Sequence, residues 1–456
     1  MNTSSGGHEF APPLADALRV AAAAWRHLRT GRSLELALAD AHGARRFLSQ
    51  PDHPRLAAAA KDIAYDATRR LALLDALIAE LVPRRPAPDI AALLAVALAQ
   101  LLAERHAQYA VVDQAVLATK ADPLTRGASR MINAVLRTFL RRRDELMRAV
   151  QDDDCIQTNL PRWWLKRLQD GHPGEWRAIA RAQRLPPPLV LRVNSRRLTV
   201  PAYLDRLARA GIRAQRVGAQ AVWLHEPRSA DRIPGFSDGE VSVQDAGAQL
   251  AAHFLALRDG QRVLDACAAP GGKTGHMAEL ADVSIEAIDS DPRRAALIES
   301  NLARLGTGRS QRVSVRVADA LNLTTAAIGM FDRVLLDAPC TASGIVRRHP
   351  DIPWLRRQGD VANLATLQCR LFDALWPLVN PAGRLLYVVC SLFAEEGAER
   401  VARIVARHAD ARAVPLPGLS TPTLQLLPSA LDIDSDCADP LPSVHDGFLY
   451  ALFEKT

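Results

Sequence analysis

Apolar residues recur at helical spacing through almost all of residues 11–150. Ala and Leu dominate this part of the chain, and the apolar positions repeat with a period near 3.6 residues, which is typical of amphipathic helices. Prolines between residues 83 and 88, and the pair Asp122-Pro123, interrupt the pattern and mark helix ends. The pattern therefore predicts an all-α bundle, with helices over residues 14–25, 54–81, 89–105, 111–120 and 128–150.

After residue 150 the pattern becomes mixed. Short strands are expected over 189–193 and 221–224 with a helix between them, which predicts a small α/β module over residues 151–239. From residue 240 to 456, short apolar strands alternate with amphipathic helices, so a mostly parallel, doubly wound, Rossmann-like sheet is expected. The expected strands are 262–265, 283–289, 313–317, 331–337, 384–389 and 447–453, and the expected helices are 273–280, 292–305, 362–378 and 395–408.

A glycine turn between the first strand and helix of this sheet, Val263 to Thr274, is typical of a ligand-binding loop. A phosphate-binding P-loop is disfavoured because Cys267 stands where its first glycine belongs, and the dinucleotide pattern G-x-G-x-x-G is absent. S-adenosylmethionine fits better, because Asp289 follows the next strand and could bind ribose hydroxyls. A purely structural turn remains the alternative.

Polar side chains follow several strands of the expected sheet. Asp265, Asp289, Asp319, Asp337 and Cys390 all fall at or just after strand ends, so we expect them at one edge, where doubly wound sheets bind ligands. Cys340 follows Asp337 by three residues. A thiolate that adds to carbon 6 of a pyrimidine makes carbon 5 nucleophilic enough to accept a methyl group. Two cysteines beside a methyl-donor loop therefore indicate this chemistry, with Asp337 a candidate partner for N3 and the amino group of cytosine.

Charge is uneven along the 456 residues. Residues 1–200 hold 30 Lys and Arg against 20 Asp and Glu, a net +10, whereas residues 201–456 carry −3. This asymmetry is typical of a basic region that binds a polyanion such as RNA. The alternative is codon bias, because a GC-rich genome also gives a chain rich in Arg and Ala. Arg126 to Arg148 forms a basic amphipathic stretch that could lie along phosphates or simply face solvent.

The remaining composition excludes several classes. The six cysteines contain no C-x-x-C pair, so neither a zinc site nor a disulfide framework is expected, and no metal is implied. Residues 1–10 do not form a signal peptide, and the longest apolar run, 90–103, is too short to span a membrane. We therefore expect a cytoplasmic protein that does not associate with a membrane. We also expect it to be a monomer.

Three motifs resemble those of the RNA cytosine-C5 methyltransferases of the Sun class, most closely the bacterial Sun/Fmu branch. They are Asp265 to Thr274, Asp337-Ala-Pro-Cys340 with Ser343-Gly344, and Cys390-Ser391. Further support comes from residues 191–194, 243–246, 347–351 and 446–450. The resemblance covers nearly the whole chain and implies a NusB-like RNA-binding domain at residues 11–150, a linker and small module at 151–239, and a methyltransferase domain at 240–456.

The resemblance also implies site roles. Asp289 would bind the ribose of S-adenosylmethionine, Asp319 would lie near its adenine, and Asp337 near its methionine end and the target base. Cys390 would be the nucleophile and Cys340 would assist release of the product. The cofactor loop would consist of Cys267, Ala268, Ala269, Pro270, Gly271, Gly272 and Lys273.

The expected function is methylation of a cytosine in small-subunit ribosomal RNA. A transfer-RNA methyltransferase and a non-catalytic RNA-binding assembly factor are the alternatives. Val389 departs from the family, which usually has Thr before the nucleophile, and residues 411–445 carry no interpretable pattern. Arg347 and Arg348 are expected to contact phosphates or bases, and His276 and His349 have no metal-spaced partners.

Overall fold

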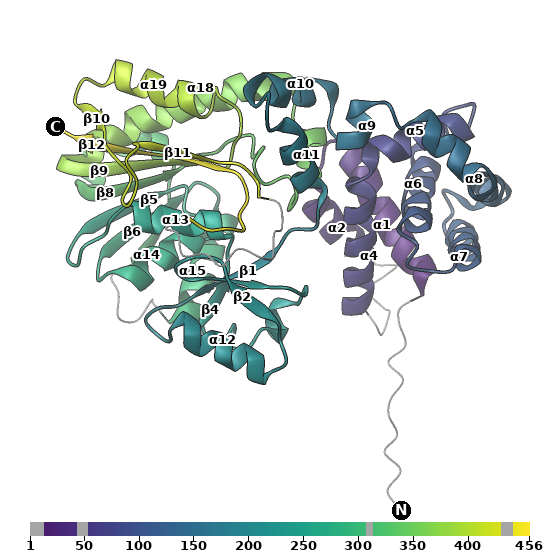
Figure 1. Ribbon diagram of the computed structural model, residues 1–456, viewed down its shortest axis with the longest axis horizontal. Coiled ribbons are helices and arrows are strands. Elements are labelled where there is room, and N and C mark those ends of the chain that lie inside the picture. The colour runs from purple at the N-terminus through teal and green to yellow at the C-terminus, as the bar shows by residue number, and fades with distance from the viewer. Residues whose placement is uncertain (1–12, 43–52, 307–312, 430–440) are drawn as a thin grey trace, which may run out of the picture. The chain divides into compact units, whose positions relative to one another are not determined.

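The computed structural model describes residues 13–42, 53–306, 313–429 and 441–456. The chain divides into two compact units (Figure 1). One comprises Met1–Lys166 together with His349–Arg356, and the other comprises Arg167–Arg348 together with Arg357–Thr456. Residues 1–10, which are not expected to form a signal peptide, lie outside the described residues, as do Cys437 and part of the segment 411–445 that carries no interpretable pattern.

The first unit is the predicted helical bundle, and α6 (Pro88–Ala103) lies at its centre. Residues 92–101 of α6 are all buried, and the helix contacts α1, α4, α5, α7 and α8. A helix that is apolar on every side needs partners on every side, which explains its central place. The other helices are α1 (Leu14–Arg29), α2 (Leu34–His42), α4 (His53–Thr68), α5 (Leu71–Leu81), α7 (Gln108–Ala121), α8 (Ser129–Ala149) and α9 (Asp154–Thr158).

The helix predicted over residues 54–81 is in fact two helices, α4 and α5. The side chain of Asn159 bridges the break, since its amide donates to the Thr68 carbonyl (2.9 Å) and its oxygen accepts from the Ala72 amide (3.0 Å). These bonds satisfy backbone groups that a continuous helix would have paired internally. The short helix α2 was not predicted from the sequence.

A segment distant in sequence completes this unit. It contains α17 (Ile352–Leu355), and Trp354 and Leu355 pack against the core of the bundle. The buried carboxylate of Asp351 accepts a hydrogen bond from the Leu34 amide (2.8 Å). Leu34 is the first residue of α2, so Asp351 caps this helix from another part of the chain.

The second unit begins with α10 (Arg162–Gly171), which crosses the division between the units, and α11 (Trp176–Arg184). A four-stranded antiparallel sheet in the order β2-β3-β1-β4 follows, with α12 (Val200–Arg209) packed on it. This sheet confirms the predicted small α/β module, and its last strand, which begins at Val241, lies beyond the predicted end of the module at residue 239. The strands are β1 (Leu189–Val193), β2 (Ala214–Arg216), β3 (Ala221–Leu224) and β4 (Val241–Val243).

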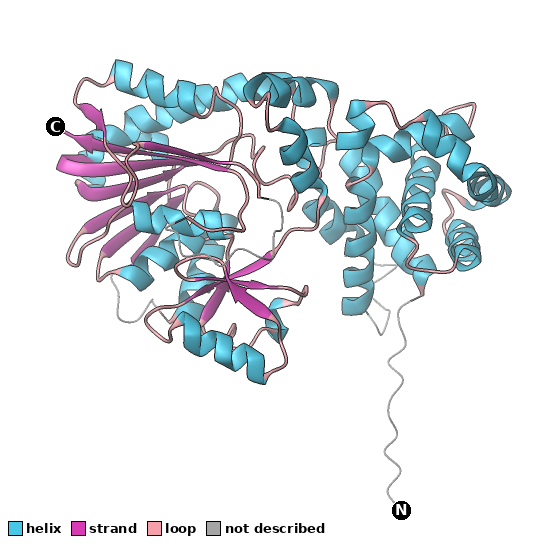
Figure 2. Ribbon diagram, viewed as in Figure 1, coloured by secondary structure: helices cyan, strands magenta, loops and turns pink. Residues whose placement is uncertain are grey.

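The large sheet has eight strands, drawn in magenta in Figure 2. Five are parallel in the order β9-β8-β5-β6-β7, and β12, β10 and β11 extend the sheet antiparallel from β9. The predicted doubly wound sheet is therefore confirmed as a mixed one. The strands are β5 (Arg262–Ala266), β6 (Ser284–Asp289), β7 (Val313–Val317), β8 (Phe331–Asp337), β9 (Val379–Val389), β10 (Ala411–Ala413), β11 (Thr423–Leu426) and β12 (Phe448–Lys455).

Helices cover both faces of this sheet. Leu264 of β5 packs into the cluster that contains α18 and α19, whereas its neighbour Val263 packs into the cluster that contains α13 and α14. Successive strand residues point to opposite faces, so a strand buried on both sides reads as a continuous apolar run. The helices are α13 (Ala246–Phe254), α14 (Gly272–Leu280), α15 (Pro292–Leu305), α16 (Thr325–Ile328), α18 (Gln358–Leu375) and α19 (Ala398–Arg407).

Of the helices in the described part of the chain, none combines the length and apolar character of a membrane span.

Candidate active site

The carboxyl ends of the parallel strands gather the predicted polar residues at one edge of the large sheet. Asp289 and Asp337 are the last residues of β6 and β8, and Cys390 directly follows β9. Because β8 lies between β5 and β9, the glycine turn after β5 and the two cysteine loops come from adjacent strands. The predicted convergence is confirmed for these residues.

The glycine turn uses one glycine for a conformational reason. Gly271 has a φ of +90°, and a Cβ at this position would lie 3.0 Å from Cγ2 of Ile298 and 3.1 Å from its Cα. The space that a side chain at Gly271 would need is thus occupied by Ile298 of α15, and it is not space for a ligand. Cys267 also has a positive φ, +65°, so the turn is tightly wound at both ends.

The turn is fastened to the small sheet by a buried arginine that sequence reasoning did not single out. Arg192 of β1 donates to the carbonyl of Gly272 (2.7 Å) and forms two hydrogen bonds with Glu279 of α14 (2.6 and 2.9 Å). Both side chains of this ion pair are almost fully buried. The small module therefore holds the first turn of α14 in place.

Asp265 lies beneath the turn and is completely buried. Its Oδ2 accepts from the Thr274 hydroxyl (2.6 Å), whereas among the described residues its Oδ1 has no hydrogen-bond partner. Burial raises the pKa of this carboxyl to about 7, although the Thr274 bond opposes the shift. An unpartnered buried oxygen marks a polar position that a ligand or water could satisfy.

Asp289 is oriented by the loop itself. Its two oxygens accept from the amides of Ala269 (3.2 Å) and Asp291 (3.1 Å), and Arg294 lies 3.5 Å away. Asp319 differs from the other aspartates, because it is exposed and caps the short helix after β7 through the Leu321 amide (2.9 Å). Ala268 and Ala269 are buried, and Pro270 is exposed.

Lys273 and Asp337 form an ion pair, with Nζ 2.6 Å from Oδ2. Burial lowers the pKa of Lys273, but the Asp337 carboxylate outweighs it and Cys390 adds to the effect, so the net shift is upward. Lys273 is therefore a cation at the centre of the site. Among the described residues, Oδ1 of Asp337 accepts no hydrogen bond.

The two predicted cysteines are neighbours. Sγ of Cys340 lies 3.4 Å from Sγ of Cys390, and Cys340 is the more buried of the two. Its hydrogen bond to Cys390, together with burial, raises the pKa of Cys340 well above that of an ordinary thiol. Cys340 is thus held as a neutral thiol beside Cys390. The pKa of Cys267 is also raised, to about 12, by burial and the nearby aspartates.

A buried carboxylate, Glu396, connects the two cysteine loops, and the sequence analysis missed it. One oxygen accepts from the Thr341 amide (2.9 Å) and from Nε2 of Gln368 (3.0 Å). The other accepts from the hydroxyls of Thr341 and Ser391. Thr341 and Ser391 each directly follow a cysteine, so Glu396 positions the backbone on which both thiols are carried. An acidic residue six positions after Cys390 was the only signal in the sequence.

The loops also approach at the backbone. The Gly344 amide donates to the Cys390 carbonyl (2.9 Å), and the Gly447 amide donates to the Gly344 carbonyl (2.9 Å). A Cβ on Gly344 would lie 2.2 Å from the Gly447 carbonyl oxygen, so only glycine fits.

Arg347 and Arg348 do not have the predicted free guanidinium groups. Arg347 is fully buried, pairs with Asp446 and donates to the carbonyls of Ser429 (3.1 Å) and His445 (2.6 Å). Arg348 pairs with Asp446 and with Asp245 (2.9 Å). The expected phosphate or base contact is therefore wrong for Arg347, which is buried because the C-terminal segment supplies a carboxylate that the linear sequence does not place beside it. For the half-buried Arg348 it stays a prediction.

Known families match the three parts of the chain. The family of 16S rRNA methyltransferases RsmB/F matches residues 252–454, a ferredoxin-like domain of RsmF/B-like methyltransferases matches residues 160–231, and the NusB family matches residues 18–141. These matches confirm the predicted fold class.

Individual relatives match over most of their length. Ribosomal RNA small subunit methyltransferase B of Erwinia tasmaniensis is 38% identical over 410 residues, which are 88% of this chain and 90% of the relative. The protein of the same name from Pseudomonas putida is 40% identical over 408 residues, 87% of this chain and 89% of the relative. The crystal structure of PH0851 aligns with a TM-score of 0.73 at 26% identity over 97% of this chain and 99% of that one. Because these relatives are similar to this chain over most of its length, the chain belongs to the 16S rRNA methyltransferase RsmB/F family.

Proposed function

We propose that this protein uses S-adenosylmethionine to methylate carbon 5 of a cytosine in small-subunit ribosomal RNA, through a covalent bond between Cys390 and carbon 6 of the base. The observation that carries the proposal is the pair of thiols 3.4 Å apart, beside the Lys273–Asp337 ion pair. Methyl transfer to nitrogen or to a ribose hydroxyl needs no cysteine nucleophile, so a buried thiol pair at this edge favours carbon 5.

The residues around the glycine turn fit S-adenosylmethionine, which when bound supplies the methyl group. The chemistry of the donor set supports this. Asp289 presents a carboxylate suited to ribose hydroxyls, and the buried Oδ1 of Asp265 lacks a partner among the described residues. We assign the segment from Cys267 to Lys273 and Asp337 to the same site. Asp319 is the weakest member of the set, although its exposed carboxylate can still accept from an adenine amino group.

In the proposed reaction, the sulfur of Cys390 forms a bond to carbon 6 of cytosine. The attack needs hydrogen-bond partners at N3 and at the amino group of the ring. Oδ1 of Asp337 can accept a hydrogen bond from the amino group. Carbon 5 then carries the electron density that accepts the methyl group. Removal of the carbon-5 proton by a base re-forms the double bond and expels the Cys390 thiolate.

Two observations support Cys390, and not Cys340, as the nucleophile. Cys340 is the more buried thiol, and its raised pKa keeps it protonated. Lys273 is a cation whose charge interacts with Cys390. Cys340 is then placed to act in proton transfer when the product is released.

A denaturing-gel shift tests this assignment. The full-length wild type, Cys340→Ala and Cys390→Ala are incubated with S-adenosylmethionine and unmethylated small-subunit ribosomal RNA. We expect Cys340→Ala to accumulate a covalent RNA adduct that survives denaturation, because product release is slowed, and Cys390→Ala to form none. Cys155→Ala, a cysteine of the helical unit, is the matched control and should behave like the wild type.

The opposite pattern would make Cys340 the nucleophile. If the wild type methylates transfer RNA but not ribosomal RNA, the substrate assignment is wrong. If no RNA accepts methyl and no variant is trapped, the protein acts as a binding factor and the proposed function fails.

A further inference from the structure

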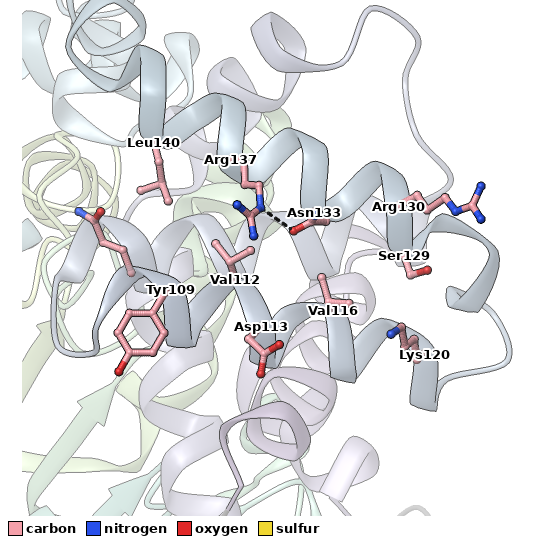
Figure 3. A pocket seen from close by; sticks show the side chains of 11 residues that line it. Tyr109, Val112, Asp113, Val116, Lys120, Ser129, Arg130, Asn133, Arg137 and Leu140 are labelled. Carbon is pink, nitrogen blue, oxygen red and sulfur yellow. Dashed lines mark hydrogen bonds between the residues drawn. The ribbon is translucent and has the colours of Figure 1, made fainter.

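A groove runs between α7 and α8 in the helical unit, far along the sequence from the cysteines, and has a volume of about 710 Å³ (Figure 3). Its residues recur at helical spacing on both walls. On α7 they include Tyr109, Val112, Val116 and Lys120, and on α8 they include Arg130, Asn133, Arg137 and Leu140. One face of each helix therefore forms the groove.

The floor and the rim differ in character. Val112 is buried and Val116 and Leu140 are partly buried, so the floor is apolar. Lys120, Arg130 and Arg137 supply three cations at the rim, against the single carboxylate of Asp113. A polyanion whose phosphates lie at the rim and whose flat bases reach the floor complements this arrangement.

The arginines of α8 differ in whether they form ion pairs. Away from the groove, Arg142 pairs with Glu145 and Arg143 pairs with Glu104. Within the described residues, Lys120 and Arg130 have no ion pair, and Arg137 bonds only to the neutral side chain of Asn133 (3.1 Å). The three cations of the groove are thus available for phosphates. Within the described residues the same holds for Arg141 and Arg148 elsewhere on α8, which bond only to the Thr138 hydroxyl and the Asp144 carbonyl.

Tyr109 stands at one end of the groove with 81% of its surface exposed. An aromatic ring this exposed is a stacking platform for an unpaired base, whereas double-stranded RNA is bound mainly through its backbone and shape. From Tyr109 to Lys120 the wall extends over eleven residues of helix, about 16 Å at the usual rise. This length suits a few nucleotides of a single strand.

We infer that the α7–α8 groove binds a single-stranded segment of the substrate RNA, with a base stacked on Tyr109 and phosphates on Lys120, Arg130 and Arg137. The inference rests on the proposed RNA substrate and adds to it the site, the strandedness and the residues of contact.

Fluorescence anisotropy with the full-length protein tests the phosphate contacts. The probe is transcribed, unmethylated small-subunit ribosomal RNA, titrated at several salt concentrations. Arg130→Ala and Arg137→Ala should each weaken binding and reduce the slope of log K against log salt by about 1. Arg142→Ala, which removes the same charge from α8 outside the groove, should leave the affinity and the slope at wild-type values.

The stacking contact is tested with a labelled single-stranded RNA oligonucleotide and a duplex of equal length. Tyr109→Ala should weaken binding of the single strand about tenfold and affect the duplex little, and Tyr109→Phe should restore the wild-type affinity. Equal losses for Arg142→Ala and Arg137→Ala, or wild-type RNA affinity in every groove variant, would overturn the inference and leave the groove to a protein partner. Methyl transfer by the wild type, measured separately, reports on the proposed function whatever the groove variants do.

Discussion

At the scale of single residues, Glu396 does most to bring the two thiols together. It accepts from four donors, namely the Thr341 amide, Nε2 of Gln368 and the hydroxyls of Thr341 and Ser391. Cys390 itself is preceded by Val389, so the usual Thr hydroxyl is absent there, and the hydroxyls of Thr341 and Ser391 are instead held by the carboxylate. The orientation of Cys390, the proposed nucleophile, thus depends on a residue outside the recognised motifs.

Glu396→Ala should lower the unfolding free energy by about 1–3 kcal/mol, because buried donors lose their acceptor. It should also lower the kcat of methyl transfer by up to about 100-fold through misplacement of the thiols. Urea denaturation and steady-state kinetics measure the two effects. Glu396→Gln should recover part of the activity, and Glu399→Ala, an exposed acidic residue of α19, is the control. A wild-type kcat in Glu396→Ala would refute the positioning role.

Asp265 predicts a pH dependence. In the unfolded chain this carboxyl ionises near 3.8, but in the folded protein it stays protonated up to about 7. The folded state binds the extra proton, so this group's contribution to stability is full at low pH and is lost as the pH rises through that window. Asp265→Asn keeps an acceptor for Thr274 and removes the titration. From pH 5 to pH 7 the unfolding free energy of the wild type should fall by about 2 kcal/mol relative to the variant. Equal pH profiles would show that the Asp265 pKa is not raised.

At the scale of elements, the strand–turn–helix unit formed by β5 and α14 shows which features of a motif can be predicted from the sequence. The apolar run and the glycines predicted the unit, because local propensity and backbone freedom suffice to form it. They did not reveal that Ile298 of α15 occupies the space beside Gly271, or that Arg192 of another sheet holds Gly272. Both facts depend on residues brought together only by folding.

Gly271→Ala should destabilise the protein more than Gly260→Ala. Both glycines have a positive φ, +90° and +82°, so each substitution should cost about 1–3 kcal/mol of backbone strain. A Cβ at Gly260 meets nothing within 4 Å, whereas one at Gly271 presses on Ile298. Thermal unfolding compares the two, and calorimetry with S-adenosylmethionine should show weaker binding for Gly271→Ala alone. Equal destabilisation would mean that Ile298 moves aside freely.

At the scale of the whole molecule, the chain crosses between its two compact units more than once. The segment His349–Arg356 follows the Cys340 loop in sequence but belongs to the helical unit, where Asp351 caps α2. Sequence periodicity assigns such a segment to the domain that surrounds it. The division into three functional domains, at residues 11–150, 151–239 and 240–456, stays a prediction.

Asp351→Ala should lower the unfolding free energy of the helical unit by about 1 kcal/mol, the usual effect of losing a helix cap. Hydrogen exchange followed by mass spectrometry should show faster exchange of the Leu34 amide and the start of α2. Asp351→Asn retains a side-chain oxygen acceptor and should protect these amides nearly as well as the wild type. Unchanged exchange in Asp351→Ala would show that α2 does not need the cap.

The sequence by itself determined the helical bundle, the strand–helix alternation and the edge at which Asp289, Asp337 and Cys390 meet, because periodicity and strand polarity are local properties that survive any packing. Tertiary structure decided the rest. It buried Arg347 against Asp446, paired Arg348 with the same carboxylate, and joined the cysteine loops through Glu396. Among the described residues it also left the three cations of the α7–α8 groove without an ion pair. Whether a charged side chain is buried, paired or available depends on which distant residue folding places within about 3 Å of it, since hydrogen bonds and ion pairs act only at that range.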